Sequence, residues 1–195
     1  MGTLTRLIVL AVSVLSLFGG AAATAGAFAW HNTGSTSFTA TTGTPTLTST
    51  SARWECTAAH MTGDAPAATV GATYFIRGTI GYTGCSFAGV STGVDCNFTL
   101  TLTSQSGSQT TGDADMTCRW YQFAAQLCHL AGSLHAVYTN PVSGVGTLTL
   151  TTGGNLIAKN PASGSCPLGN GDRVHQSEMT FRTTSANPPI LTRTA

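Results

Sequence analysis

Two stretches of the chain alternate strictly between threonine and leucine. Residues 99–103 have the sequence Thr-Leu-Thr-Leu-Thr, and residues 147–151 repeat it. A period of two puts successive side chains on opposite faces of a strand, so that one face is buried and the other meets water. Threonine is β-branched and suits the water-facing side. Both stretches are therefore predicted to be half-buried β-strands.

Short runs of apolar and β-branched residues continue through most of the chain. Glycine-rich turns separate these runs at the spacing typical of sandwiches and barrels. A short helix over 120–130 is the alternative at one place, but Cys118 and Cys128 bracket that stretch, which favours a loop or an irregular strand. The remaining expected strands are 54–60, 73–82, 114–120, 130–139, 155–159 and 178–183. We predict an all-β protein, either an antiparallel β-sandwich or a partly closed barrel.

One hairpin has a predictable register. With its turn at residues 106–108, Phe98 faces Met116 and the apolar residues of both strands share one side. A slip of one residue would reverse this arrangement, so the register is well specified. The same register puts Cys96 opposite Cys118, where Cα atoms about 4.5–5.5 Å apart are within reach of a disulfide. The polar side of the hairpin then carries Thr99, Thr101, Asp113 and Asp115.

Six cysteines follow the N-terminal segment, and an even number is typical of a disulfide-bonded exported domain. Zinc sites use close pairs such as C-x2-C, and no two cysteines here are that close, so no metal or other cofactor is expected. The hairpin register supports Cys96–Cys118. Cys56–Cys85 and Cys128–Cys166 are then the simplest remaining pairs. The alternative set contains the local links Cys85–Cys96 and Cys118–Cys128.

The first 25 residues have the features of a secretory signal peptide. Arg6 precedes an apolar run over 7–18, and small residues follow. The apolar run is shorter than the ~20 residues of a membrane-spanning helix, so no membrane span is expected in the mature chain. The A-x-A rule allows cleavage after Ala25 or after Ala29. We expect a secreted protein in which residues 26–52 form a Thr/Ser/Gly-rich leader or a first strand, and residues 53–195 form one disulfide-bonded β domain.

Charged residues make up 8% of the chain, and the formal net charge is +1. Globular proteins usually contain about 25% charged residues. This composition gives no indication of binding to nucleic acid or to acidic lipid. Threonine, the commonest residue type, and other neutral polar side chains must keep the protein soluble.

Catalytic motifs are absent from the sequence. It contains no G-x-S-x-G elbow, no H-E-x-x-H motif and no P-loop. Asp113 and Asp115 form the closest carboxylate pair, but the hairpin register puts both on the exposed face, where surface acids or a weak calcium site are expected. No catalytic residue is assigned.

The densest aromatic cluster is Arg119-Trp120-Tyr121-Gln122-Phe123. Between two cysteines, Trp120 and Tyr121 would offer a platform for sugar rings or for an apolar partner surface. The alternative is that these rings cap the core. We assign Arg119, Trp120 and Tyr121 as the candidate binding residues, with carbohydrate or another extracellular protein as the expected partner.

These observations favour an extracellular binding or structural protein without enzymatic activity. Two alternatives remain open. One is a secreted hydrolase whose Ser, His and acid come together from distant parts of the chain. The other is a secreted inhibitor or effector that inserts a disulfide-held loop into its partner.

The cysteine pattern resembles that of a family of small exported six-cysteine proteins of high-GC Gram-positive bacteria. This resemblance implies an exported β-domain. It implies no catalytic residues, because the family has no established activity. The motifs that carry it are Cys56, Gly81-Tyr82-Thr83-Gly84-Cys85, Cys96, Cys118, Cys128, Val137-Tyr138-Thr139 and Gly164-Ser165-Cys166.

Overall fold

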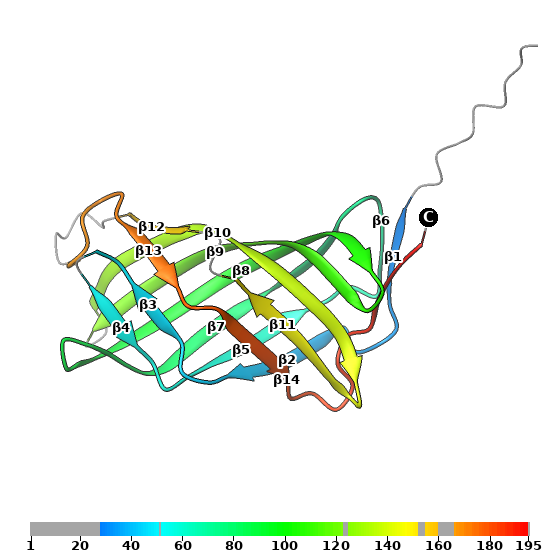
Figure 1. Ribbon diagram of the computed structural model, residues 1–195, viewed down its shortest axis with the longest axis horizontal. Helices are drawn as coiled ribbons and strands as arrows, with labels where there is room; N and C mark the ends of the chain where they lie inside the picture. The colour runs from blue at the N-terminus through cyan, green and yellow to red at the C-terminus, as the bar shows by residue number, and fades with distance from the viewer. Residues whose placement is uncertain (1–27, 51, 123–124, 152–154, 160–165, 195) are drawn as a thin grey trace, which may run out of the picture.

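A computed structural model describes residues 28–50, 52–122, 125–151, 155–159 and 166–194. The regular structure within these ranges consists of β-strands (Figure 1). In chain order they are β1 (Ala29–Asn32), β2 (Ser37–Thr42), β3 (Thr46–Thr48), β4 (Arg53–Glu55), β5 (Ala58–Asp64), β6 (Ala68–Val70), β7 (Tyr74–Phe87), β8 (Val90–Ser106), β9 (Gln109–Gln122), β10 (Ala125–Val142), β11 (Val145–Leu150), β12 (Asn155–Lys159), β13 (Arg173–Gln176), β14 (Met179–Thr183) and β15 (Leu191–Thr194).

Four long strands form one continuous wall of the molecule. β7, β8, β9 and β10 contain 14, 17, 14 and 18 residues and pair as antiparallel neighbours in chain order. Two sets of short strands close this wall into rings. One set, β5, β2, β14 and β11, joins β7 to β10 in one half of the molecule. The other set, β4, β3, β13 and β12, joins the same two strands in the other half.

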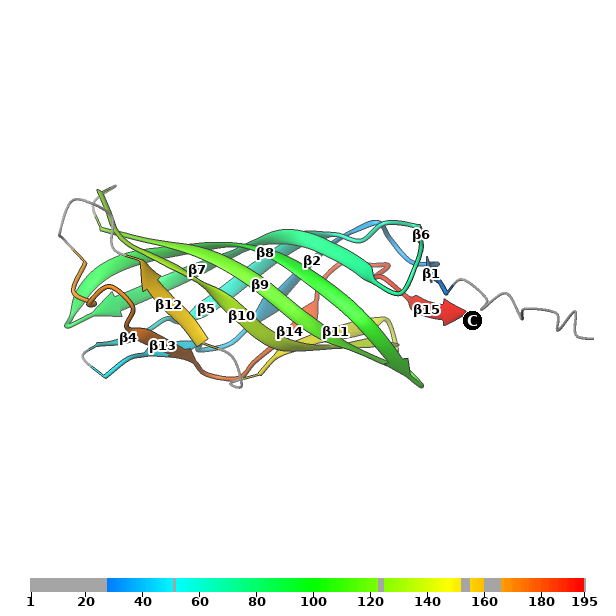
Figure 2. The same cartoon turned by 90° about the horizontal axis from the view of Figure 1, so that it is seen from above.

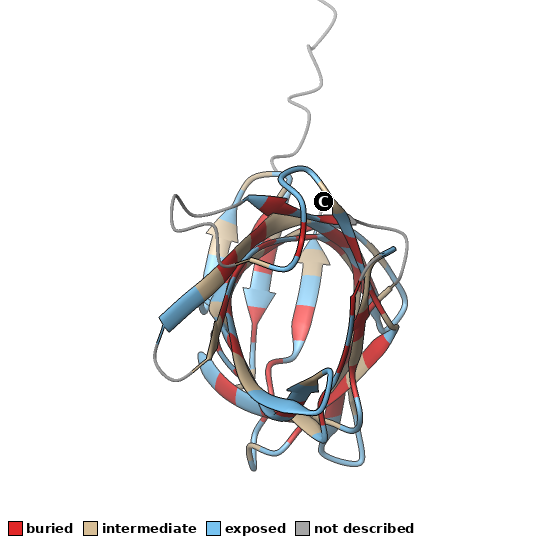
Figure 3. Ribbon diagram, turned by 90° about the vertical axis from the view of Figure 1, so that its left-hand side faces the viewer, coloured by how far each residue is buried: buried red, intermediate tan, exposed pale blue. Residues whose placement is uncertain are grey.

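The two rings share their long strands and form one elongated barrel. Figure 2 shows the long strands passing from one end to the other, and Figure 3 shows the ring of strands end-on. Closure gives the edge strands β7 and β10 partners on both sides, so neither leaves a row of unpaired backbone groups. The predicted antiparallel all-β fold is confirmed, and of the two predicted architectures the structure has the barrel.

Two predicted element boundaries are wrong. The strand expected over 54–60 is two strands, because the chain passes from one ring to the other between Cys56 and Thr57. There the Cys56 amide donates to the Pro45 carbonyl at 3.0 Å and the Thr57 amide donates to the Thr83 carbonyl at 2.9 Å. Over 120–130 a loop or an irregular strand is expected from the sequence, and the described residues there belong to two paired strands with an irregularity between Gln126 and Cys128, since β9 continues to Gln122 and β10 begins at Ala125.

Alternate residues of the long strands fill the interior of the barrel. In β8, every second residue from Val94 to Leu102 is buried, whereas the residues between them face outward. The half of the barrel closed by β4 and β13 contains an aromatic cluster. The rings of Trp54 and Trp120 lie 4.2 Å apart in a T-shaped arrangement, and Phe87 lies 5.3 Å from each of them. Since side chains occupy the interior, the outer wall is the part of the protein that ligands can reach.

A small three-stranded sheet covers the end of the barrel where the described termini meet. β1 lies between β15 and β6 and pairs with both in the antiparallel sense (Figure 1). Side chains at this end form contacts that hold the sheet in place. The Trp30 indole donates to the Ala72 carbonyl at 3.4 Å, and the Tyr138 hydroxyl donates to the Pro189 carbonyl at 2.5 Å. The guanidinium of Arg193 lies 4.0 Å from the centre of the Phe28 ring.

The three predicted disulfides are confirmed, and the six cysteines contain no free thiol. The hairpin register is also confirmed, since Phe98 faces Met116 and Cys96 faces Cys118. The alternative set with local links is wrong. In particular, Cys118 lies opposite Leu130 rather than opposite Cys128.

The predicted signal peptide, residues 1–25, lies outside the described residues. Part of the 26–52 segment forms β1, β2 and β3, which pair with the rest of the β structure. The described ranges contain no helix with the length and apolar character needed to cross a membrane.

Candidate functional site

A hollow of the outer wall crosses β2, β5 and β7 and has a volume of ≈ 590 Å³. Threonines of neighbouring strands form its floor, because Thr39 faces Thr62 and Thr62 faces Thr79 in the ladder. The hydroxyl oxygens of Thr62 and Thr79 lie 2.9 Å apart. Asp64 supplies a carboxylate. The rim carries further neutral polar groups, from Ser35, Ser37, Ser185 and Asn187.

A second hollow of ≈ 300 Å³ lies beside the first, over β7, β8 and β9. It exists because Gly81 has no side chain, while its neighbours in the ladder and along the strands carry polar groups. These neighbours are Thr79, Asp95, Asn97 and Arg119. The nearest atom to a Cβ placed at Gly81 would be an oxygen of Asp95, 3.6 Å away. This carboxylate therefore lies beside the hollow.

Thr79 lines both hollows, so they form one band across the wall. We call this band the outer-wall groove and define it by the lining residues given above. The volumes of its two parts lie within the roughly 300–1,000 Å³ range of small-molecule sites. The groove is open to solvent, and most of its polar groups are neutral.

Tyr121 lies flat on the wall next to the groove, two residues after the lining residue Arg119, and is not itself a lining residue. A Cβ placed at Gly93, the residue opposite Tyr121, would lie 2.2 Å from atoms of the phenol ring, so the ring covers this glycine. Tyr121 is half-buried. Burial raises the pKa of Tyr121, the nearby Asp95 carboxylate raises this pKa further, and Arg119 lowers it. Ring, carboxylate and guanidinium thus form one cluster.

The three candidate binding residues do not share one surface. Arg119 is exposed and Tyr121 is half-buried, whereas Trp120 is only 1% exposed and belongs to the aromatic cluster inside the barrel. Strand alternation causes this separation, because Trp120 points inward when its two neighbours point outward. Trp120 therefore cannot offer its ring to a ligand on the wall, and a binding role stays a prediction for Arg119 and Tyr121.

A third hollow, of ≈ 450 Å³, lies over β3, β4 and β7. Its charged lining residues, Arg53 and Glu55, form an ion pair with an N–O distance of 2.8 Å. None of the described residues lining this hollow is aromatic. It therefore offers a ligand fewer free charges and no ring.

A histidine and a carboxylate meet at one place on the outer wall. His135 Nδ1 lies 3.5 Å from Asp113 Oδ1, and both side chains are more than half exposed. Neither residue lines any of the three hollows. Asp115 is exposed as well, so the acids of the hairpin lie on its water-facing side as predicted. Within the described ranges, no three His, Cys, Asp or Glu side chains come together as a set of metal ligands.

The groove residues Asp64, Thr79 and Asp95 were not predicted, because each looks ordinary in the sequence. Asp95 is one acid among seven, and Thr79 is one threonine in a threonine-rich chain. The position of Asp95 could have been predicted from the hairpin register, which puts Asp95 opposite Arg119 and Gly93 opposite Tyr121. No comparable signal exists for Thr79 and Asp64, because their neighbours come from strands that are not connected by a short turn.

Comparisons with known proteins add no family. No family model matches the chain, and neither a curated protein nor a solved structure is significantly similar to it.

Proposed function

We propose that this chain is an exported, non-enzymatic protein that binds saccharides in the outer-wall groove. The observation that carries the proposal is the cluster of Tyr121, Asp95 and Arg119 at the end of a groove floored by threonine hydroxyls. A phenol ring held flat on a wall offers an apolar face to a sugar ring, while its polar edge stays in water. Carboxylate and guanidinium groups form strong hydrogen bonds with hydroxyl groups.

The composition of the groove favours a saccharide over an apolar ligand. Most of its lining side chains carry hydroxyl, amide or charged groups, and its large apolar side chains, Phe38 and Ile80, are buried. A pocket for an apolar small molecule would instead be lined mainly by hydrophobic and aromatic side chains. A hydrolase is less well supported, because the pair His135 and Asp113 lies outside the hollows of the wall.

Three observations support export. The chain carries three disulfides, which are typical of oxidising compartments. Its cysteine pattern resembles that of exported proteins of high-GC Gram-positive bacteria, and its first residues have the features of a signal peptide.

Cleavage after Ala25 fits the fold better than cleavage after Ala29, because the Phe28 carbonyl accepts a hydrogen bond from Gly71 and the Phe28 ring contacts Arg193.

The saccharide proposal is tested by affinity electrophoresis of the disulfide-bonded protein in gels that contain one polysaccharide each. We expect retardation by at least one polymer. Tyr121→Ala should abolish this retardation, whereas Tyr121→Phe should keep most of it because the ring remains. The matched control is Asp113→Asn, which removes an exposed carboxylate of the same strand outside the groove. Binding that is unchanged in Tyr121→Ala, or no retardation by any polymer of a broad panel, would disprove the proposal.

A further inference from the structure

A row of basic side chains continues the groove beyond Arg119. In the ladder Arg119 faces His129 across β9 and β10, and His129 faces Lys159 across β10 and β12. Residues directly opposite one another have Cα atoms about 4.5–5.5 Å apart. Arg119 and Lys159 are exposed and His129 is half-buried, so all three lie on the outer side of the wall.

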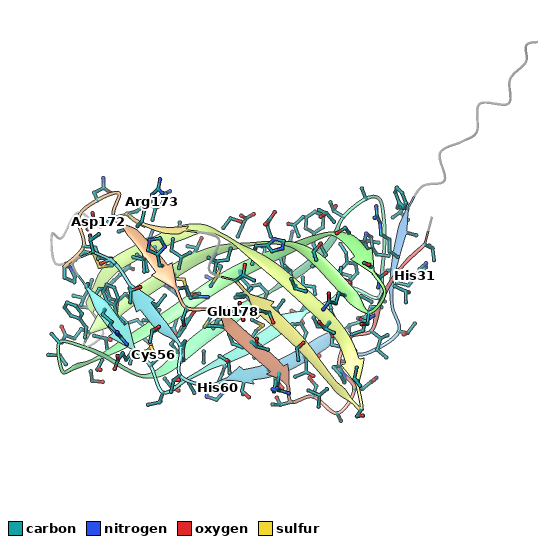
Figure 4. All side chains as sticks on the ribbon, in the orientation of Figure 1. His31, Cys56, His60, Asp172, Arg173 and Glu178 are labelled. Atoms are coloured by element: carbon teal, nitrogen blue, oxygen red, sulfur yellow. A yellow bond between two sulfur atoms is a disulfide. The ribbon has the colours of Figure 1, made fainter. Side chains whose placement is uncertain are left out.

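Arg173 adds a further positive charge at this end. It faces Ile157, two residues before Lys159, and is exposed. In Figure 4 its side chain projects from the upper side of the molecule, whereas His60 of β5 lies on the lower side. We call Arg119, His129, Lys159 and Arg173 the basic row. Asp64 lies on β5, on one side of β7 and β8, whereas the row begins on β9, on their other side, and extends to β13.

The members of the basic row form no close ion pair. In the described part of the chain, the ion pairs within 4.0 Å involve Arg53 and His135 but no member of the row. Two carboxylates lie near the row. Asp95 faces Arg119 in the ladder, and Asp172 accepts a hydrogen bond from the Gly169 amide at 2.8 Å.

We propose that the saccharide bound in the outer-wall groove carries an anionic group, which the basic row binds. This inference rests on the proposed function and specifies its ligand class. The guanidinium group of arginine matches the geometry of carboxylate and phosphate, and lysine adds a compact positive charge. The anionic group is therefore a carboxylate or a phosphate borne by the glycan.

The distribution of charge along the groove limits how the anionic groups are spaced on the ligand. Asp64 and Asp95 line the groove, and both would repel an anion bound next to them. From β5 to β12 there are five strand spacings, or roughly 24 Å at ~4.8 Å each. A polymer with a negative charge on every short repeat fits poorly over this distance. A mainly neutral glycan with sparse acidic groups, or with one at its end, fits both ends of the groove.

The test uses affinity electrophoresis with three classes of polymer: a neutral glucan, a glycan that contains uronic acid, and a phosphate-bearing glycan of bacterial cell walls. We expect an acidic polymer to bind more tightly than the neutral one, and the acidic polymer that binds best identifies carboxylate or phosphate as the group recognised. Lys159→Gln should weaken binding of that polymer by up to about fivefold, the upper end of the range for a solvent-exposed charge pair. Higher salt should weaken it in the same direction.

Arg182→Gln is the matched control, because Arg182 is an exposed arginine of β14 outside the groove and the basic row. Equal binding of acidic and neutral polymers, with no effect of Lys159→Gln, would overturn this inference and leave the proposed function intact if Tyr121→Ala still abolishes binding. Acidic binding that Lys159→Gln weakens but Tyr121→Ala leaves unchanged would mean charge attraction without the groove, and it would overturn both.

Discussion

Glycines that face aromatic residues recur along the wall of the barrel. Phe38 faces Gly63, and Phe98 faces Gly78 on the neighbouring pair of strands. In each pair the ring covers the glycine, since a Cβ placed at Gly63 would lie 2.6 Å from the Phe38 ring and one at Gly78 would lie 2.8 Å from the Phe98 ring. Glycine permits the strong local bend that a narrow barrel needs, and the ring covers the backbone that it leaves bare.

Gly78 should tolerate no side chain. A Cβ there would lie 2.0 Å from the Thr62 carbonyl oxygen, a backbone atom that can move only with its strand. We expect Gly78→Ala to lower the free energy of unfolding by about 2–3 kcal/mol, in the range for overpacking of a core. Denaturant unfolding of both proteins measures this difference.

The control for this variant is Gly43→Ala. A Cβ at Gly43 would have no atom within 4 Å, so the stability should change little or rise slightly. If both variants lower the free energy of unfolding equally, the short distance between Gly78 and the Thr62 carbonyl is not the cause of the loss.

At the scale of single strands, β15 is held in an unusual way. One of its edges pairs with β1 through the backbone. On the barrel, two side-chain amides take the place of a partner strand. Asn140 accepts from the Leu191 amide at 2.8 Å and donates to the Leu191 carbonyl at 2.7 Å, and Gln105 donates to the same carbonyl at 2.7 Å and accepts from the Arg193 amide at 2.6 Å.

Removing these amides should release β15. We expect Asn140→Ala to destabilise the protein by about 1–3 kcal/mol, because the Leu191 amide loses its acceptor while the Leu191 carbonyl keeps only Gln105. Hydrogen exchange followed by mass spectrometry should show faster exchange in residues 191–194 and in β1, with β8 and β9 unchanged. If exchange rises equally in all strands, β15 is not a separate unit and this account of its attachment is wrong.

Element boundaries show where sequence reasoning succeeded at this scale. The register of β8 and β9 was predictable, because a short turn connects them and a one-residue slip would bury threonines and aspartates. The division between β4 and β5 was not predictable. It depends on Thr83 in β7 and on Pro45 in the loop before β3, which accept the hydrogen bonds of the connecting residues.

At the scale of the whole molecule, the two rings differ in how they are held together. The second ring is the one closed by β4, β3, β13 and β12. Three of its strand junctions contain only two residue pairs each, namely β4 with β7, β3 with β13 and β12 with β13. Two disulfides act on this ring. Cys56–Cys85 ties the passage between β4 and β5 to β7, and Cys128–Cys166 ties the segment before β13 to β10.

The ring with short junctions should therefore depend more on its disulfides. Replacing Cys128 and Cys166 together by alanine should cost about 4 kcal/mol, as expected for a link between residues 38 apart in sequence. We expect faster hydrogen exchange in β12, β13 and β3 than in β2 and β5. The matched variant replaces Cys96 and Cys118, which join two strands already paired along most of their length. In this variant, hydrogen exchange should not rise more in β12, β13 and β3 than in β2 and β5. If both variants show the same distribution of exchange over the strands, the prediction is wrong.

Hydrophobic alternation and cysteine number by themselves determined the β fold, the oxidised cysteines and the register of one hairpin. These properties depend on residues close in sequence, or on the parity of buried positions, which a linear pattern contains. Only the tertiary structure decided the closure into two rings, the burial of Trp120, the groove around Thr79 and the row from Arg119 to Lys159. Each of these depends on which distant strands become neighbours, and that choice is made by packing of the whole interior.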